Sequence, residues 1–511
     1  MKNTIKILAG FIAIGFVSCE PEFDKPVNEN DFYTSGEADV SNYVAVGNSL
    51  TAGYADAALY IDGQNNSYPN IMAQQFELVG GGDFTQPLMN DNLGGLLLNG
   101  QQITANRFIL GVDAMGNPGP ITLEGTPTTE ITAGPTGPFN NMGIPGAKSF
   151  HLLAPGYGSV AGVASGASNP YFARIATSQS TTVIADAVSM SPTFFSLWIG
   201  NNDILSYATS GGSGMDQTGN LDPSTYGGND ITDPNVFASV YSQEVDALTA
   251  NGAGGVLINI PDVTSIPYFT TVPVNAIPLD AATAGAVNAQ FALYNNQVLP
   301  LLVQFGVISA EEAASRVIIF SAGQNFPIIT DDDLTDVSLI LQGPPANLPA
   351  ATANLLGQLR QANENDLIVL PAASVLGTLA DPSNPASVIG VGVPLADNFV
   401  LTTTEQARVT AATASYNATI QGLANAKGLA FVDARSSLLQ VANGGIGYNG
   451  GVLTSAYVTG GAFSLDGVHP TPRGYAFTAN LIINAINQKY DATIPTVDIG
   501  TYRTVQVSNN L

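Results

Sequence analysis

Cysteine and histidine are scarce in this chain of 511 residues, which has one cysteine, Cys19, and two histidines, His151 and His469. A single cysteine excludes a disulfide bond within the chain. Structural zinc sites draw four ligands mainly from cysteine and histidine, so we expect no transition-metal site. The sequence also lacks the HExxH, CxxC, Walker and GxSxG motifs. These absences count against zinc peptidases, P-loop nucleotide-binding proteins and the common α/β-hydrolases.

Basic residues are few as well: 14 lysines and arginines stand against 40 aspartates and glutamates, which gives a formal net charge of −26 at pH 7. Nucleic-acid binding needs cationic contacts with phosphate, so we exclude nucleic acid as a partner. The same charge disfavours electrostatic docking to anionic membranes. Membrane association would therefore depend on a lipid at the N-terminus.

The N-terminal apolar run, residues 7–17, is shorter than the roughly 20 residues that a membrane span needs. Lys2 and Lys6 precede it, which is typical of a secretory signal peptide. Cys19 follows, and its position resembles the cleavage site of bacterial lipoproteins; the alternative is an ordinary signal peptide with an incidental cysteine. The resemblance implies a signal peptide over residues 1–18 and a lipid on Cys19 that anchors the protein in the cell envelope, on the outer membrane of a Gram-negative bacterium.

Residues 19–41 are polar and acidic, which predicts a solvated tether between this anchor and a folded domain. The acidic residues directly after Cys19 also resemble the surface-export signals of some lipoproteins. Beyond the tether, the chain is long enough to bury a sizeable core, because 45% of all its residues are hydrophobic.

The stretch YVAVGNSLTAG, residues 43–53, begins with a short apolar run that predicts a strand buried on both faces of a parallel sheet. Gly47 ends the run, and Ser49 follows in what we expect to be a tight strand-to-helix turn. Open α/β sheets bind their ligands at the carboxyl edge, where such a turn would place the serine hydroxyl. Taken alone, the pattern fits a serine that only caps a helix.

A second pattern lies near the other end of the chain, where Asp466 precedes His469 by three residues in the run DGVHP. A carboxylate at this spacing can accept the Nδ1 proton of the histidine and leave Nε2 facing a serine. The other histidine, His151, lies in an apolar neighbourhood, which favours a structural role.

Four separated blocks of the sequence resemble the motifs of GDSL-type esterases of the SGNH hydrolase superfamily, and they occur in the order found in that family. The blocks are GNSL at residues 47–50, NMGIPG at 141–146, GNND at 200–203 and DGVHP at 466–470. Each block alone is a weak signal, but four in order are a specific one.

The resemblance implies a serine esterase that uses no cofactor and no metal. Ser49 would be the nucleophile, His469 the general base, and Asp466 the group that orients the imidazole. The oxyanion hole would consist of the backbone N–H groups of Ser49 and Gly146 and the side-chain amide of Asn202. Within the second block, Gly143 would then serve only the turn.

The resemblance also implies a three-layer α/β/α fold with a five-stranded parallel sheet in the order 2-1-3-4-5, in one hydrolase domain over residues 42–490. Residues 491–511 would be a C-terminal extension. Residues 80–140, rich in Gly, Pro and Thr, predict inserted loops and hairpins near the site. The expected strands are residues 43–46, a strand leading into 141–146, and residues 193–199, 255–260 and 429–433.

A larger insertion, at about 267–395, contains helical patterns over residues 281–304 and 350–363. We expect it to form a cap beside the catalytic edge that shapes a pocket for an acyl or aryl group. The alternative is that its apolar runs pack only the cap's own core. Its three consecutive aspartates, residues 331–333, lack the spaced ligands of a known calcium loop, so we expect a solvated turn.

One residue departs from the family pattern: Asn48 stands where GDSL enzymes usually have Asp. Asparagine can keep the hydrogen bonds of the turn but carries no negative charge. This departure and the long insertions motivate an alternative, a cell-surface binding or scaffold lipoprotein with a weakened esterase site. For an enzyme, the sequence leaves open whether the substrate is an acyl ester or lipid, or an O-acetylated carbohydrate.

Overall fold

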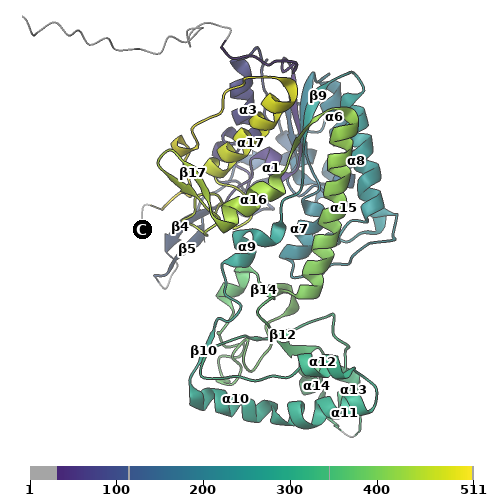
Figure 1. Ribbon diagram of the computed structural model, residues 1–511, viewed down its shortest axis with the longest axis vertical. Helices are drawn as coiled ribbons and strands as arrows, with labels where there is room; N and C mark the ends of the chain where they lie inside the picture. Colours follow the sequence, from purple (N-terminus) through teal and green to yellow (C-terminus); the bar gives the residue numbers. More distant parts are fainter. Residues whose placement is uncertain (1–31, 113–115, 345, 509–511) are drawn as a thin grey trace, which may run out of the picture.

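The computed structural model describes residues 32–112, 116–344 and 346–508 (Figure 1). The expected signal peptide and the anchor at Cys19 lie outside the described residues. Among the residues that are described, no helix is both long enough and apolar enough to cross a membrane.

Five parallel strands form the central sheet, in the order β7-β1-β8-β9-β16. Numbered along the chain, this is the order 2-1-3-4-5, so the expected fold class and strand order are confirmed. All five residues of β1 are buried, as are all five of β8, as expected for strands covered on both faces. The strands are β1 (Tyr43–Gly47), β7 (Asn141–Gly143), β8 (Phe194–Trp198), β9 (Gly254–Ile258) and β16 (Ala430–Val432).

Helices cover both faces of this sheet and complete the three layers (Figure 1). One face carries α3 (Tyr68–Glu77) and α17 (Pro472–Tyr490), and the other carries α6 (Val183–Ser189), α8 (Pro234–Thr249) and α15 (Thr403–Lys427). A capping box of Thr402 and Glu405 starts α15, because each residue's side chain accepts the other's backbone N–H.

The first insertion forms the short strands and hairpins that its composition predicts. Strand β4 (Phe108–Val112) pairs with β5 (Pro118–Thr122) in an antiparallel hairpin. A second small sheet consists of β2 (Leu96–Leu98), β3 (Gln101–Gln102) and β6 (Thr129–Glu130).

The second insertion forms a cap that projects from the catalytic half, at the bottom of Figure 1. Its long helix consists of α10 (Ala281–Leu293), the π-helical turn Tyr294–Val298 and α11 (Leu299–Gln304), as predicted. The other expected helix is shorter: α14 ends at Gly357 because β13 (Leu359–Gln361) pairs with β12 (Ile328–Thr330). The cap has its own hydrophobic core, which includes Phe291, Ile318, Ile328 and Leu356.

Two of the three consecutive aspartates of the cap, Asp332 and Asp333, are exposed and lie in a turn as expected, but Asp331 is not solvated. Asp331 is buried and forms a salt bridge with Arg360, at 2.5 Å. Asp333 is paired with Arg408 of α15. Only Asp332 forms no ion pair with a basic side chain among the described residues.

Both ends of the described chain pack against the catalytic half. Residues 34–41 were expected to belong to the tether, yet Glu37 N–H donates to the carbonyl of Tyr490 at 2.7 Å, and Ala38 and Val40 join the main core. The folded part therefore begins before residue 42. In the C-terminal extension, Val507 pairs with Leu110 in a parallel bridge.

Candidate active site

Ser49 lies at a sharp junction between the sheet and a short helix. Strand β1 ends at Gly47, and Ser49 is the first residue of α1 (Ser49–Ala52). A Cβ on Gly47 would lie 2.2 Å from Thr51 Oγ1, so only glycine fits this turn. Asn48 is the N-cap, and its Oδ1 accepts the N–H of Leu50 at 3.1 Å. Asparagine therefore performs the capping role that aspartate would perform.

The structure brings Ser49 together with Asp466 and His469, which lie more than 400 residues further along the chain. Ser49 Oγ lies 2.9 Å from His469 Nε2, and His469 Nδ1 lies 2.9 Å from Asp466 Oδ2. The ring of Tyr54 packs against the imidazole, with ring centroids 4.7 Å apart. With the Nδ1 proton held by the carboxylate, Nε2 is free to accept a proton from the serine.

Asp466 is surrounded by hydrogen-bond donors. The backbone N–H groups of Val468 and His469 donate to its Oδ1, at 2.9 and 2.8 Å. Burial acts to raise the pKa of Asp466, but the positive charge of His469 and these donors outweigh it and lower the pKa to about 2. Asp466 is therefore ionised at neutral pH.

The loop that carries Asp466 and His469 has a second group of contacts, with the segment that follows α1. The sequence did not single out this segment. Ala57 N–H donates to Asp466 Oδ2 at 3.0 Å, and Asp56 Oδ1 accepts the N–H of Leu465 at 3.0 Å. Both Asp56 and Ala57 have positive φ, 53° and 63°. Positive φ in two consecutive residues other than glycine cannot be read from a single sequence, so the signal for this support was absent.

The residues expected to stabilise an oxyanion differ in how free their N–H groups are. Asn202, at the start of α7 (Asn202–Thr209), donates one side-chain N–H to the carbonyl of Ala147 at 2.9 Å, which leaves the second for a ligand. Gly146 has φ +82°, and its N–H has no hydrogen-bond partner in the described chain. The N–H of Gly143 is bonded to Asn141 Oδ1, at 3.0 Å, and is not free.

Two further polar residues in and near these blocks, Asp203 and His151, have structural contacts. Buried Asp203 accepts both the N–H and the hydroxyl of Ser149, at 2.8 and 2.7 Å, and so joins the third block to the second. His151 Nδ1 accepts the N–H of Lys148, and its ring stacks on Tyr157 with centroids 4.4 Å apart. Burial, with a smaller effect of Lys148, lowers the pKa of His151 to about 4, so His151 is neutral at pH 7.

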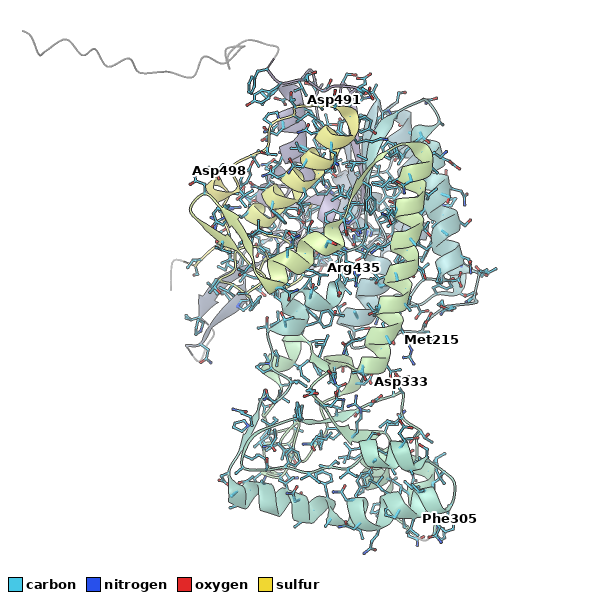
Figure 2. The ribbon with its side chains drawn as sticks, in the orientation of Figure 1. Met215, Phe305, Asp333, Arg435, Asp491 and Asp498 are labelled. Carbon is cyan, nitrogen blue, oxygen red and sulfur yellow. The ribbon has the colours of Figure 1, made fainter. Side chains whose placement is uncertain are left out.

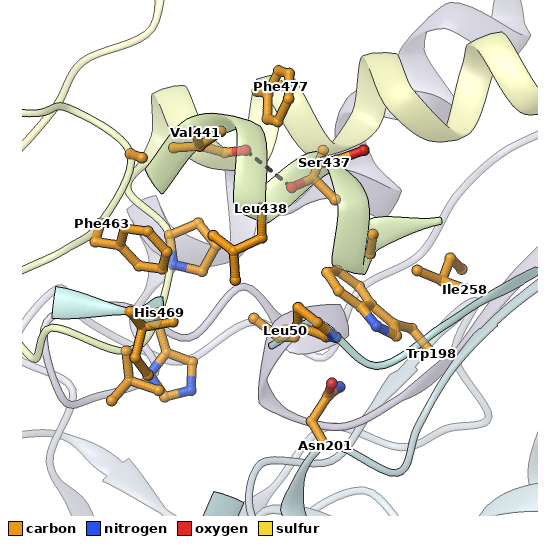
Figure 3. A pocket seen from close by; sticks show the side chains of 18 of the residues that line it. Leu50, Trp198, Asn201, Ile258, Ser437, Leu438, Val441, Phe463, His469 and Phe477 are labelled. Atoms are coloured by element: carbon orange, nitrogen blue, oxygen red, sulfur yellow. Dashed lines mark hydrogen bonds between the residues drawn. The ribbon is translucent and has the colours of Figure 1, made fainter. Parts of the chain in front are cut away.

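A cavity of about 110 Å³ opens beside Ser49, Asn202 and His469, and its wall is almost entirely apolar. In Figure 3, Leu438 of α16 (Ala434–Asn443) and Phe477 of α17 lie across the cavity from Asn201. Gly146 lines a different depression. The apolar side chains of the cavity wall include Leu50, Trp198, Ile258, Val263, Leu438, Val441, Phe463 and Phe477.

No described residue of the cap, residues 267–395, lines this cavity, which corrects our expectation that the cap shapes the pocket. The cavity wall comes instead from α16, α17 and the loops around β9 and His469. Most of the cap's buried apolar residues pack into the separate core described above, which was the alternative, whereas others such as Ile329 and Ile368 join the main core. Its base does touch the histidine loop: Tyr268 N–H donates to the carbonyl of Gly467 at 2.9 Å.

Comparison with known proteins adds little to this geometry. No model of a known protein family matches the sequence, and no curated protein matches it. Among solved structures, the chain is similar to an extracellular lipase from Streptomyces rimosus, with 10% sequence identity and a TM-score of 0.30. The match covers 88% of this chain and 99% of the lipase. A similarity this weak carries no argument about function, which therefore depends on the site.

Proposed function

We propose that this protein is a serine hydrolase that cleaves carboxylic esters at Ser49. The observation that carries the proposal is the chain of hydrogen bonds from Ser49 through His469 to Asp466, together with the apolar cavity that Ser49 and His469 line. An ionised carboxylate, an imidazole with Nε2 available and a serine hydroxyl in line are the groups that nucleophilic acyl transfer requires.

In the proposed reaction, Ser49 Oγ attacks the ester carbonyl while His469 Nε2 takes the hydroxyl proton. Asp466 holds the imidazole through Nδ1 and stabilises the imidazolium that forms. The second amide hydrogen of Asn202 and the backbone N–H groups of Gly146 and Ser49 would bind the oxyanion. His469 then protonates the departing alcohol, and a water molecule activated by the same imidazole releases the acid from Ser49.

The cavity favours an ester with a hydrocarbon acyl group over an acetylated carbohydrate. Each methylene buried in an apolar wall contributes about 0.8 kcal/mol, whereas an acetyl group would leave most of the wall without contacts. A sugar hydroxyl in this cavity would lose its hydrogen bonds with water and find few polar partners. We therefore propose acyl esters longer than acetyl as substrates.

The direct test compares the parent protein with Ser49→Ala on p-nitrophenyl acetate, butyrate and octanoate. We expect Ser49→Ala to lose activity on all three esters, and the parent to prefer the longer two. Ser415→Ala, on the exposed side of α15, is the matched control and should keep full activity. Activity in Ser49→Ala equal to that of the parent would show that Ser49 is not the nucleophile.

A fluorophosphonate probe separates the enzyme from the scaffold alternative. The probe should label the parent but not Ser49→Ala, because it reacts with activated serines. Folded parent protein that resists the probe would favour a binding or scaffold role.

We also propose that a lipid on Cys19 holds the protein at a membrane, on the basis of the N-terminal sequence pattern alone. Cys19→Ala should then move the protein from the membrane fraction to the soluble fraction of cells that express it. A protein that stays in the membrane fraction after this change would contradict lipid anchoring.

A further inference from the structure

Three carboxylates meet where the cap joins the catalytic half of the molecule. Asp332 follows β12 in the cap, Asp397 lies in the returning connection, and Glu405 lies in the first turn of α15. One oxygen from each lies within 4.8 Å of the others. Figure 2 labels the neighbouring Asp333 at the end of α15 that faces the cap. The cluster is separate from the candidate active site, because none of its members lines the cavity beside Ser49.

No basic side chain forms an ion pair with this cluster in the described chain. The two nearby arginines are already paired with other carboxylates: Arg360 with Asp331 and Asp366, and Arg408 with Asp333. Like charges this close repel each other, and burial strengthens the repulsion. Arg408 still acts on Asp332 from its pairing with Asp333, so the cluster is only partly compensated and has no ion pair of its own among the described residues.

Glu405 supplies an oxygen that has no partner. The side chain is fully buried, and its Oε2 accepts the N–H of Thr402 at 2.6 Å. Its Oε1 is shielded from solvent and has no hydrogen-bond partner. Buried carboxylate oxygens are normally bonded, and an unpaired one costs free energy. Asp332 is exposed and Asp397 is half-buried, so the cluster is partly solvated, and this buried oxygen is the feature that indicates a missing ligand.

Two consecutive glycines allow the backbone to pack directly against Glu405 and Asp397. Gly211 and Gly212, just past the end of α7, have φ of +64° and +77°. A Cβ on Gly212 would lie 2.0 Å from Glu405 Oε1, and a Cβ on Gly211 would lie 2.5 Å from the carbonyl oxygen of Asp397. The backbone can approach the acidic cluster only because both residues lack a side chain.

We propose that Asp332, Asp397 and Glu405 bind a calcium ion that fastens the cap to the catalytic half. The donors are all carboxylate oxygens, which are hard ligands, and neither cysteine nor histidine is among them. Calcium accepts six to eight oxygens in irregular geometry, and three carboxylates can supply up to six. Magnesium demands a near-ideal octahedron and usually keeps several waters, so it fits this set less well.

The test uses the purified protein, stripped with EDTA and titrated with CaCl₂ at pH 7.5 by calorimetry and thermal unfolding. We expect one ion per chain, with a Kd between about 10⁻⁶ and 10⁻³ M. The melting temperature should rise by a few degrees and then saturate with calcium. Equal concentrations of MgCl₂ should give a clearly smaller rise.

The double variant Asp332→Asn/Asp397→Asn should bind calcium at least tenfold more weakly. Without calcium it should melt at or above the temperature of the parent, because the repulsion is removed. This opposite sign in the two buffers distinguishes lost binding from misfolding. The matched control is Glu364→Gln, an exposed acid of the cap whose carboxylate forms no hydrogen bond in the described chain; it should respond to calcium as the parent does.

Three results would overturn the proposal. The first is no binding up to about 10 mM calcium, which would mean that the carboxyl groups are simply protonated. The second is unchanged calcium affinity in the double variant, which would place the ion elsewhere. The third is an equal response to magnesium and calcium, which would indicate screening of the protein's net negative charge.

Discussion

Replacing Asp466 with asparagine tests the proposed chemistry most sharply, because it changes one oxygen into an NH₂ group with little change in shape. Asp466 Oδ1 accepts hydrogen bonds from the N–H groups of Val468 and His469 and from the hydroxyl of Ser464. The amide oxygen of the new asparagine will keep these three bonds. Its NH₂ group must then take the place of Oδ2, which faces His469 Nδ1 and also accepts the N–H of Ala57, so this second bond is lost too.

An NH₂ group at this position can only donate to Nδ1, so the imidazole proton moves to Nε2. His469 would then present N–H to Ser49 Oγ and could not take the serine proton. The corresponding change in a well-studied serine protease lowers kcat about 10⁴-fold. For Asp466→Asn we expect kcat/KM to fall about 10³- to 10⁴-fold, which corresponds to about 4–5.5 kcal/mol of transition-state stabilisation.

Asp56→Asn is the matched control, because Asp56 is a buried acid in the same pair of loops that does not touch His469. Its Oδ1 accepts the N–H of Leu465, and its Oδ2 accepts the hydroxyl of Tyr60, at 3.0 and 2.8 Å. An asparagine can accept from Leu465 and donate to Tyr60, so kcat/KM should stay within about tenfold of the parent.

The assay is ester hydrolysis at pH 8, with folding checked by circular dichroism and thermal unfolding. Because the pKa of Asp466 is lowered to about 2, the parent carboxylate is ionised throughout a pH profile from 5 to 9. The difference between the two proteins should therefore persist across that range. A folded Asp466→Asn protein with more than a tenth of the parent's kcat/KM would refute the proposed role of Asp466.

Three further predictions follow from the site and the cap. Asn202→Ala should lower kcat about 10²- to 10³-fold on a p-nitrophenyl ester with little change in KM, because it removes one oxyanion donor. Leu438→Trp should reduce kcat/KM for the octanoate at least tenfold relative to the acetate, since the larger ring fills the cavity. Urea unfolding in EDTA should show that the free energy of unfolding falls as the pH rises from 5 to 8. The pKa values of Asp397 and Glu405 in the folded state, about 7 and about 8, lie above the ordinary values of 3.8 and 4.5. The folded state therefore binds more protons than the unfolded state in this pH range. Asp397→Asn should flatten that slope, and an unchanged slope would contradict it.

Four of the five strands could be predicted from sequence because each is a short, mostly apolar run that ends at a recognisable turn, whereas β7, with the sequence NMG, was placed by the family resemblance. The residues of β1 and β8 are apolar almost throughout, and buried parallel strands require that pattern. The strand order needed more than the pattern, since spacing does not determine which strands pair. It came from the family resemblance, and the hydrogen-bonded registers confirm it.

The position of the cap could not be predicted in the same way. Apolar runs show that the insertion buries a core, but they do not show whether the core faces the site or closes on itself. The shortened α14 illustrates the limit: its helical pattern continues past Gly357, yet strand pairing with β12 overrides the local preference. The carboxylate cluster could not be predicted for the same reason, because Asp332 and Glu405 meet only through tertiary packing.

The turn at Asp56 and Ala57 shows how contacts between distant parts of the chain can stabilise an unfavourable backbone conformation. Positive φ at Asp56 and Ala57 costs about 1–3 kcal/mol per residue. Two backbone hydrogen bonds between Ala55 and Ala58 close the turn locally, at 3.1 and 3.0 Å. Further contacts lie 409 residues away in the sequence, where the N–H of Ala57 reaches Asp466 Oδ2 and Asp56 reaches the N–H of Leu465. Unfavourable backbone conformations persist where the surrounding contacts determine them, and such positions concentrate at functional sites. The conformation at Asp56 and Ala57 therefore has two supports, the local turn and the contacts that hold Asp466 in line with His469, and the second is the one that the proposed chemistry requires.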